Sequence, residues 1–164
     1  RVNGSLTDHY DPSSKTLRLS DTVYGSDSVA AVGVAAHECG HALQEHDGYG
    51  LLKLRTALVP VVNIGSSLYL PIFMAGLLFS WEPLQMVGIL CFGLTLLFSL
   101  VTLPVEINAS KRALGMLEGV LDAEELQGAK AVLSAAALTY LASVISSALQ
   151  LLRLILISRS RNRD

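Results

Sequence analysis

Three long runs without a single charged residue constrain this sequence more than any other feature. They cover residues 56–80, 84–105 and 131–152, and so contain 25, 22 and 22 residues. A helix of about 20 apolar residues crosses the hydrocarbon core of a bilayer, so each run is long enough to span a membrane. Buried helices of soluble proteins are usually shorter and carry a polar stripe. The sequence therefore predicts a mainly α membrane protein with about three transmembrane helices.

The first two runs are separated only by a short break around Trp81, Glu82 and Pro83. Tryptophan and charged residues are typical of the membrane interface, so we expect a helical hairpin that turns there. A hairpin returns the chain to the side that it left. The segment after the second run is therefore expected on the same side of the membrane as the residues before the first run. Pro60 and Pro71 predict a kink in the first helix, which a membrane helix tolerates.

The overall composition agrees with this interpretation and excludes one class of partner. Hydrophobic residues make up 51% of the chain and charged residues 16%, whereas soluble domains carry about 25% charge. The net charge is −2, and positive charge is concentrated only in the tail, at Arg153, Arg159, Arg161 and Arg163. We therefore expect a lipid bilayer and no nucleic acid as partner. Two distant cysteines predict neither a disulfide framework nor a cysteine zinc site. We also expect no signal peptide within the sequence.

The polar N-terminal part predicts a strand followed by a helix. Residues 16–20 alternate between polar and apolar side chains after the turn-forming residues 11–14, as in a short strand. A mainly apolar segment at 28–47 is expected to form a helix capped by Ser26 or Asp27 and ended by Gly48. Such an apolar helix is expected to be buried, which would make it a rigid support for a site.

This predicted helix carries the pattern His-Glu-x-x-His at His37, Glu38 and His41. Positions four apart lie on one face of a helix, so the two imidazoles converge on one point, as a metal ion requires. Glu38 is then placed to reach a water molecule at that point, which is the arrangement of zinc peptidases. Cys39 points away from the shared face, and the small residues Cys39 and Gly40 allow other groups to approach closely.

A catalytic zinc ion usually has three protein ligands, so a third group is expected on the same side of the membrane. His46 faces another direction on the helix, and Asp122 with Glu125 is more typical of a capping box at a helix start. Glu106, the first charge after the second run, is equally compatible with a metal ligand and with an interfacial charge. The candidates are Asp8, His9, His46, Asp47, Glu106, Glu118, Asp122, Glu124 and Glu125.

Three segments carry a resemblance to a known family. LTDHYDP at residues 6–12, VAAHECGHALQ at 34–44 and LPVEINAS at 103–110 resemble the YugP-like family of neutral zinc metallopeptidases of bacterial membranes. The similarity covers nearly the whole chain and includes the hairpin between the two metal motifs. It implies one zinc ion bound by His37, His41 and Glu106, with Glu38 as the general base. The implied activity is that of an integral-membrane zinc metalloendopeptidase, which hydrolyses peptide bonds with a zinc-activated water.

The arrangement is also similar to the prenyl-protein and heat-shock membrane proteases, with one departure. Those proteins usually carry an aspartate four residues after the ligand glutamate, where it can orient a zinc histidine. This sequence has Ser110 there, with Asn108 in between. Possible donors to the oxyanion are His9, Tyr10 and Arg112. The substrate is expected to be a peptide or protein, either free or associated with the membrane. The similarity favours an active site on the cytoplasmic side of the cell membrane.

These interpretations divide the chain into four parts. Residues 1–55 would form a zincin-like strand and active-site helix, and 56–105 the transmembrane hairpin. Residues 106–130 would form the third-ligand helix and connector, and 131–164 the last transmembrane helix with the basic tail. The alternative function is a non-catalytic membrane zinc-binding scaffold or a transporter. Transporters place polar ligands near the bilayer midplane, whereas the three uncharged runs here contain no His, Asp or Glu.

Overall fold

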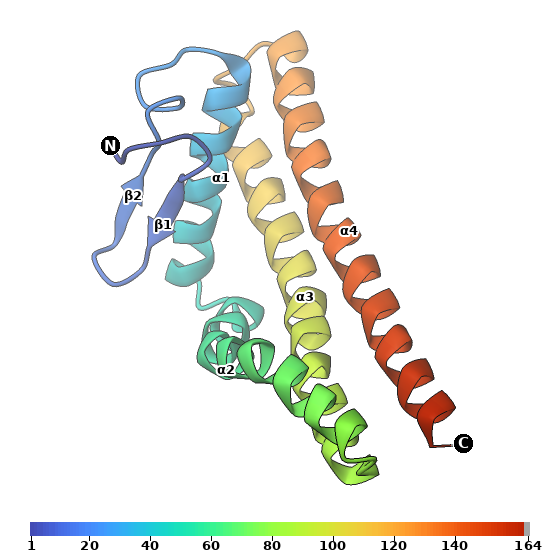
Figure 1. The fold of residues 1–164 in the computed structure, drawn as a ribbon. Coiled ribbons are helices and arrows are strands. Elements are labelled where there is room, and N and C mark those ends of the chain that lie inside the picture. Colours follow the sequence, from blue (N-terminus) through green and yellow to red (C-terminus); the bar gives the residue numbers. More distant parts are fainter. Residues whose placement is uncertain (163–164) are drawn as a thin grey trace. The chain divides into compact units, whose positions relative to one another are not determined.

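The computed structural model describes residues 1–162, which form two short strands and four helices (Figure 1). Their order is β1 (His9–Asp11), β2 (Thr16–Arg18), α1 (Val29–His46), α2 (Gly50–Leu78), α3 (Glu82–Leu117) and α4 (Ala123–Arg161). Arg163 and Asp164, the end of the predicted basic tail, lie outside the described residues. The chain divides into two units. The first consists of Arg1–Lys53 with Pro104–Thr139, and the second of Leu54–Leu103 with the chain from Tyr140 onward.

The three uncharged runs lie in α2, α3 and α4, and all three helices are long and apolar enough to cross a membrane. The prediction of a mainly α protein with three such helices is confirmed. The helices contain 29, 36 and 39 residues and thus extend beyond the runs. In particular, α3 continues without a break through Pro104 into the segment that carries Glu106. Proline removes only one backbone donor, and neighbouring groups in a membrane protein can compensate for it.

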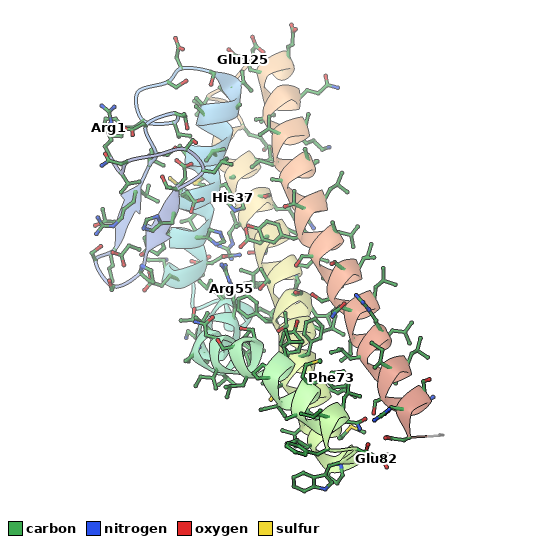
Figure 2. The ribbon with its side chains drawn as sticks, viewed as in Figure 1. Arg1, His37, Arg55, Phe73, Glu82 and Glu125 are labelled. Carbon is green, nitrogen blue, oxygen red and sulfur yellow. The ribbon has the colours of Figure 1, made fainter. Side chains whose placement is uncertain are left out.

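The second unit contains the predicted hairpin between α2 and α3. The close approach depends on glycines: a Cβ added at Gly76 would lie 2.5 Å from the backbone nitrogen of Gln85, and one at Gly88 would lie 2.7 Å from Cβ of Phe73. Small residues of this kind let membrane helices pack closely. Glu82, expected in the turn, instead begins α3. Figure 2 labels Phe73, which forms a core with Ile89, Phe92 and Leu154.

Both prolines of the first run lie inside α2. In Figure 1, the early part of α2 is seen nearly end-on, whereas its later part runs across the view, so the helix changes direction along its length. Proline is a recognised cause of such kinks, because its ring blocks one hydrogen bond and crowds the preceding turn. The change of direction agrees with the kink that the sequence predicts.

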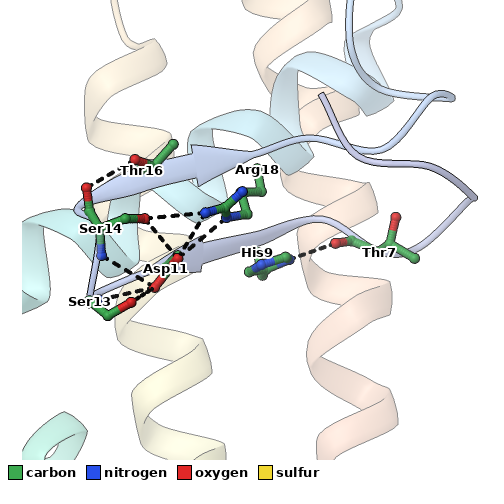
Figure 3. Close-up of polar contacts among 7 residues, drawn as sticks. All are labelled: Thr7, His9, Asp11, Ser13, Ser14, Thr16 and Arg18. Carbon is green, nitrogen blue, oxygen red and sulfur yellow. Dashed lines mark hydrogen bonds and ion pairs between the residues drawn. The ribbon is translucent and has the colours of Figure 1, made fainter.

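In the first unit, β1 and β2 form an antiparallel hairpin in which His9 is opposite Arg18 and Asp11 is opposite Thr16. The predicted strand is therefore shorter than expected, and its partner β1 was not predicted. Figure 3 shows how Asp11 closes the turn: its carboxylate accepts hydrogen bonds from the hydroxyls of Ser13 and Ser14, at 2.6 and 2.7 Å. The turn chemistry of this segment thus sets the register of the hairpin.

Helix α1 begins at Val29, one residue later than a cap at Asp27 would place its start. Ser28, and neither Ser26 nor Asp27, is the N-cap residue, and its hydroxyl accepts a hydrogen bond from the backbone N–H of Ala31 at 3.2 Å. A serine hydroxyl bonds the third residue after it, so the start of the helix decides which of the neighbouring candidates caps it. Gly48, with a φ of +68°, follows the helix, as predicted.

The core of the first unit is built largely from alanines of α1, α3 and α4. Ala36, Ala113, Leu117, Ala129 and Leu133 are buried together. Small side chains let the backbones approach each other closely, which brings α1 near the C-terminal part of α3. At the start of α4, Asp122 and Glu125 each accept a hydrogen bond from the other's backbone N–H, so the predicted capping box is confirmed.

Candidate metal centre

The two histidines of the His-Glu-x-x-His pattern lie on the same face of α1, as the spacing predicts. Their ring centroids are 4.8 Å apart, and the rings are nearly perpendicular, at 89°. The side chains of His37 and His41 are only 15% and 12% exposed. Figure 2 shows His37 on the side of α1 that faces α3. The two imidazoles are therefore held in a partly dry place between two helices.

Glu106 on α3 completes a cluster of three. Its Oε2 atom lies 3.0 Å from Nε2 of His37 and 3.5 Å from Nε2 of His41, and its side chain is 3% exposed. Within residues 1–162, this is the group of three His, Cys, Asp or Glu side chains whose donor atoms come close enough to hold a metal ion, all within 4.8 Å of one another. The structure thus joins Glu106 to the two histidines, and it does so from a different helix.

Gly40 explains how the two helices come so close. It lies between the two histidines, and a Cβ added there would be 2.3 Å from the carbonyl oxygen of Ala109. No side chain can be accommodated at that distance from a backbone atom. Ala109 itself is fully buried, three residues after Glu106. The predicted role of a small residue at this position is confirmed, because only glycine lets α3 bring Glu106 into reach.

The donor set fits a zinc ion. Two imidazole nitrogens and one carboxylate oxygen are ligands that zinc prefers. Ligand atoms at about 2.1 Å from a tetrahedral zinc ion lie roughly 3.4 Å from one another. The two separations to Glu106, 3.0 and 3.5 Å, are close to that value. Three protein ligands also leave a fourth position free for water or substrate.

Glu38 lies next to this cluster on α1 and is largely buried. Burial raises the pKa of Glu38, and the nearby carboxylate of Glu106 raises it further. The two histidines and a hydrogen bond from the backbone of Tyr10 in β1 act in the opposite direction, but the pKa stays above its usual value. A carboxylate with a raised pKa is better suited to accept and then return a proton near neutral pH.

Each histidine also has a partner for its second ring nitrogen. Nδ1 of His37 lies 3.0 Å from Oγ of Ser110, and Nδ1 of His41 lies 2.9 Å from Oε1 of Gln44. The hydroxyl of Ser110, four residues after Glu106, thus contacts one of the two histidines. Gln44 was not identified from the sequence, although its position three residues after His41 on the same helix face was available as a signal.

The other polar residues singled out from the sequence already have partners. Arg112 donates hydrogen bonds to Asp47 and to Oδ1 of Asn108. The hydroxyl of Tyr10 donates to Glu45, and this bond raises the pKa of Tyr10 to about 12. His9 is exposed, and its ring contacts the carbonyl oxygen of Thr7, as Figure 3 shows. Ser110 therefore contacts the cluster directly. Asn108 is connected to it through Gln44, and Arg112 through Asn108. His9 does not belong to it.

The remaining candidates for the third ligand lie elsewhere in the described part of the chain. His46 is 84% exposed and contacts Asp47. Asp8 accepts hydrogen bonds from the backbone N–H and the hydroxyl of Ser20. None of Asp8, His9, His46, Asp47, Glu118, Asp122, Glu124 or Glu125 belongs to the cluster.

Cys39 lies on a different face of α1, as predicted. It lines a mainly apolar pocket of about 410 Å³ together with Ala35, Ala36, Leu19 and Met116, among others. Burial raises the pKa of its thiol, and the charge of Glu38 adds to the effect. A thiol with a raised pKa is a poor metal ligand at neutral pH, because thiolate is the binding form.

Comparison with known proteins agrees with this geometry. Residues 1–159 match the family described as "Putative neutral zinc metallopeptidase". The chain belongs to this family. A member described as "Putative membrane protease YugP" from Bacillus subtilis is 46% identical over 158 residues, which cover 95% of this chain and 70% of that protein. The comparison with solved structures found no match. The resemblance seen in the sequence is therefore confirmed over almost the full length of the chain.

Proposed function

We propose that the protein is an integral-membrane zinc metalloendopeptidase. The observation that carries the proposal is the convergence of His37, His41 and Glu106 within 4.8 Å of one another, beside Glu38. Two imidazoles and a carboxylate bind one zinc ion per chain in this proposal. The family description and the name of the relative in Bacillus subtilis support the same activity.

The chain's own residues supply the remaining chemistry. When bound, zinc supplies Lewis acidity, which lowers the pKa of water and polarises a peptide carbonyl. Glu38 accepts the proton of the attacking water at its carboxylate and then transfers it to the leaving amine. The burial of Glu38 and Glu106 keeps bulk water away from the reacting groups.

We further propose that β1, β2 and α1 form a reduced zincin-like catalytic part, corresponding to residues 1–55, and that α2, α3 and α4 span a membrane. In that topology the α2–α3 hairpin of residues 56–105 returns the chain to the side of α1. Residues 106–130 then supply the third ligand and the connector, and 131–164 contain the last transmembrane helix and the basic tail. The substrate is a peptide or protein associated with the membrane, and the catalytic part faces the cytoplasm.

The activity is tested with Glu38→Gln, which keeps the shape of the side chain but removes its basicity. We expect the purified variant in detergent to retain zinc, measured by elemental analysis, and to lose proteolysis. Glu124→Gln is the matched control, because Glu124 is exposed at the start of α4 and lies outside the cluster. Normal turnover by Glu38→Gln would exclude Glu38 as the base. Wild-type protein that binds zinc but cleaves no peptide would favour a scaffold.

The topology is tested by cysteine labelling in intact cells, after both native cysteines are replaced by alanine. Asp27→Cys and Glu124→Cys should react only when the cytoplasmic side is accessible, whereas Glu82→Cys should react from outside. All three positions are exposed. Labelling of Glu82→Cys from the same side as the other two would contradict the spanning hairpin.

A further inference from the structure

We propose that Gln44 is a positioning residue that holds His41 in a single tautomer, with the proton on Nδ1 and the lone pair of Nε2 directed at the metal centre. The inference deepens the proposed function and rests on His41 being a zinc ligand. Gln44 is fully buried and lies three residues after His41 on α1. Its side chain contacts the imidazole on one side and α3 on the other.

The direction of the hydrogen bonds can be traced from Arg112. A guanidinium group has only donors. Nε of Arg112 lies 2.9 Å from the side chain of Asn108, so Asn108 must present its oxygen there. The same Oδ1 atom of Asn108 lies 3.0 Å from the amide of Gln44. Gln44 must therefore direct its NH₂ group toward Asn108.

A second acceptor fixes Gln44 in the same orientation. The backbone carbonyl oxygen of Val105, which can only accept, lies 2.8 Å from Nε2 of Gln44. The two hydrogens of the NH₂ group are thus used by Val105 and Asn108. The remaining atom, Oε1, faces Nδ1 of His41 at 2.9 Å, and an amide oxygen can only accept. His41 must consequently donate from Nδ1.

A neutral imidazole carries one proton, so donation from Nδ1 leaves Nε2 as the free base. Nε2 of His41 is the atom that faces Glu106, at 3.5 Å. The imidazole is therefore presented in the form that binds a metal before any metal arrives. Partners of this kind hold the ring in position and raise its basicity as a ligand.

The other histidine is held differently. The partner of Nδ1 in His37 is the hydroxyl of Ser110, at 3.0 Å. A hydroxyl can both donate and accept, so this contact is compatible with either tautomer of His37. Ser110 thus does not define the tautomer of His37, whose Nε2 atom faces the carboxylate of Glu106 at 3.0 Å, whereas Gln44 defines the tautomer of His41. The difference between the two histidines is a specific consequence of the proposal.

The test is ¹⁵N NMR of histidine-labelled full-length protein in detergent, stripped of metal, at a pH where the imidazoles are neutral. His41 is assigned from the signal that disappears in His41→Asn. We expect Nδ1 of His41 to have a protonated shift and Nε2 an unprotonated one. Gln44→Glu keeps an acceptor for Nδ1 and should keep the proton there, although it loses the two donors to Val105 and Asn108. Gln44→Met has a similar shape without the acceptor and should give a mixture of tautomers.

Zinc affinity, measured by competition with a chelator, provides a second readout. Gln44→Met should bind zinc about 10- to 100-fold more weakly than the wild type. A mixture of tautomers in the wild type, or an unchanged His41 pattern in Gln44→Met, would overturn the proposal. A merely structural Gln44 would lower the melting temperature of Gln44→Met without changing the tautomer. Because the NMR readout needs neither zinc nor substrate, a protein without peptidase activity could still show the tautomer, and an active one could lack it.

Discussion

Replacing Gly40 by alanine tests whether the contact between α1 and α3 holds the metal ligands together. The added Cβ would lie 2.3 Å from the carbonyl oxygen of Ala109, whereas an ordinary contact begins at 3.4 Å. Since the three atoms nearest to this Cβ are all backbone atoms of Ala109, the helices must separate by about 1 Å. Zinc–ligand distances tolerate only about 0.2 Å of deviation, so Glu106 would no longer reach the ion that the histidines hold.

The cost in stability can be approximated in the same way. Overpacking a buried contact typically costs 1–3 kcal/mol, and a clash with backbone belongs at the upper end of this range, about 3 kcal/mol. Alanine recovers about 1 kcal/mol through its higher helix propensity. We therefore expect Gly40→Ala to be destabilised by about 2 kcal/mol. Its zinc affinity should fall at least tenfold, as is typical when a residue that supports a metal ligand is lost.

The matched control for this variant lies on the same helix. A Cβ added at Gly33 would lie 3.7 Å from Cβ of Ala129, which is an ordinary contact. Gly33→Ala should therefore retain zinc affinity and melt at the same temperature or slightly higher. Thermal melting and chelator competition in detergent measure both quantities. Normal zinc affinity in Gly40→Ala would refute the argument that this glycine sets the distance between the ligands.

Three further changes have defined outcomes. Glu106→Ala removes the ligand from α3 and should lower the zinc content strongly, whereas a change at the exposed Glu118, to alanine, should not. If elemental analysis gave the same zinc content for Glu106→Ala and the wild type, Glu106 would not be a ligand. Ser28→Ala removes the N-cap of α1 and should lower the free energy of unfolding by about 1 kcal/mol, with a smaller effect for Ser26→Ala, as chemical denaturation can show. Tyr10 has a pKa raised from 10.0 to about 12, so its hydrogen bond contributes stability below pH 10 that is lost as the pH rises through 12. The ultraviolet difference between wild type and Tyr10→Phe should accordingly titrate near pH 12, and a midpoint near 10 would contradict that bond.

Local sequence patterns were sufficient to predict those features of the fold and the site that depend on a single segment of the chain. The uncharged runs predicted α2, α3 and α4 because crossing a bilayer requires length and the absence of charge. His37 and His41 converge because the geometry of a single helix places them on one face. The capping box of Asp122 and Glu125 involves only neighbouring residues. In each case the cause lies within one segment of the chain.

The features that the sequence did not predict depend on contacts between segments. The role of Gln44 requires the carbonyl oxygen of Val105 and the side chain of Asn108, both more than 60 residues away on α3. The strand β1 is defined by its pairing with β2, since its own three residues carry no alternation. Glu106 could not be separated from an interfacial charge by position alone, because only the approach of α3 at Gly40 brings it to the histidines.

The metal centre is tested by identifying the atoms that surround a bound zinc ion. X-ray absorption at the zinc edge, on protein loaded with one equivalent of zinc in detergent, reports these atoms without requiring a substrate. We expect two imidazole nitrogens and a carboxylate oxygen at about 2.0–2.2 Å, with a further light atom from water. A sulfur ligand at about 2.3 Å, or a spectrum with fewer than two imidazoles, would contradict a metal centre made by His37, His41 and Glu106.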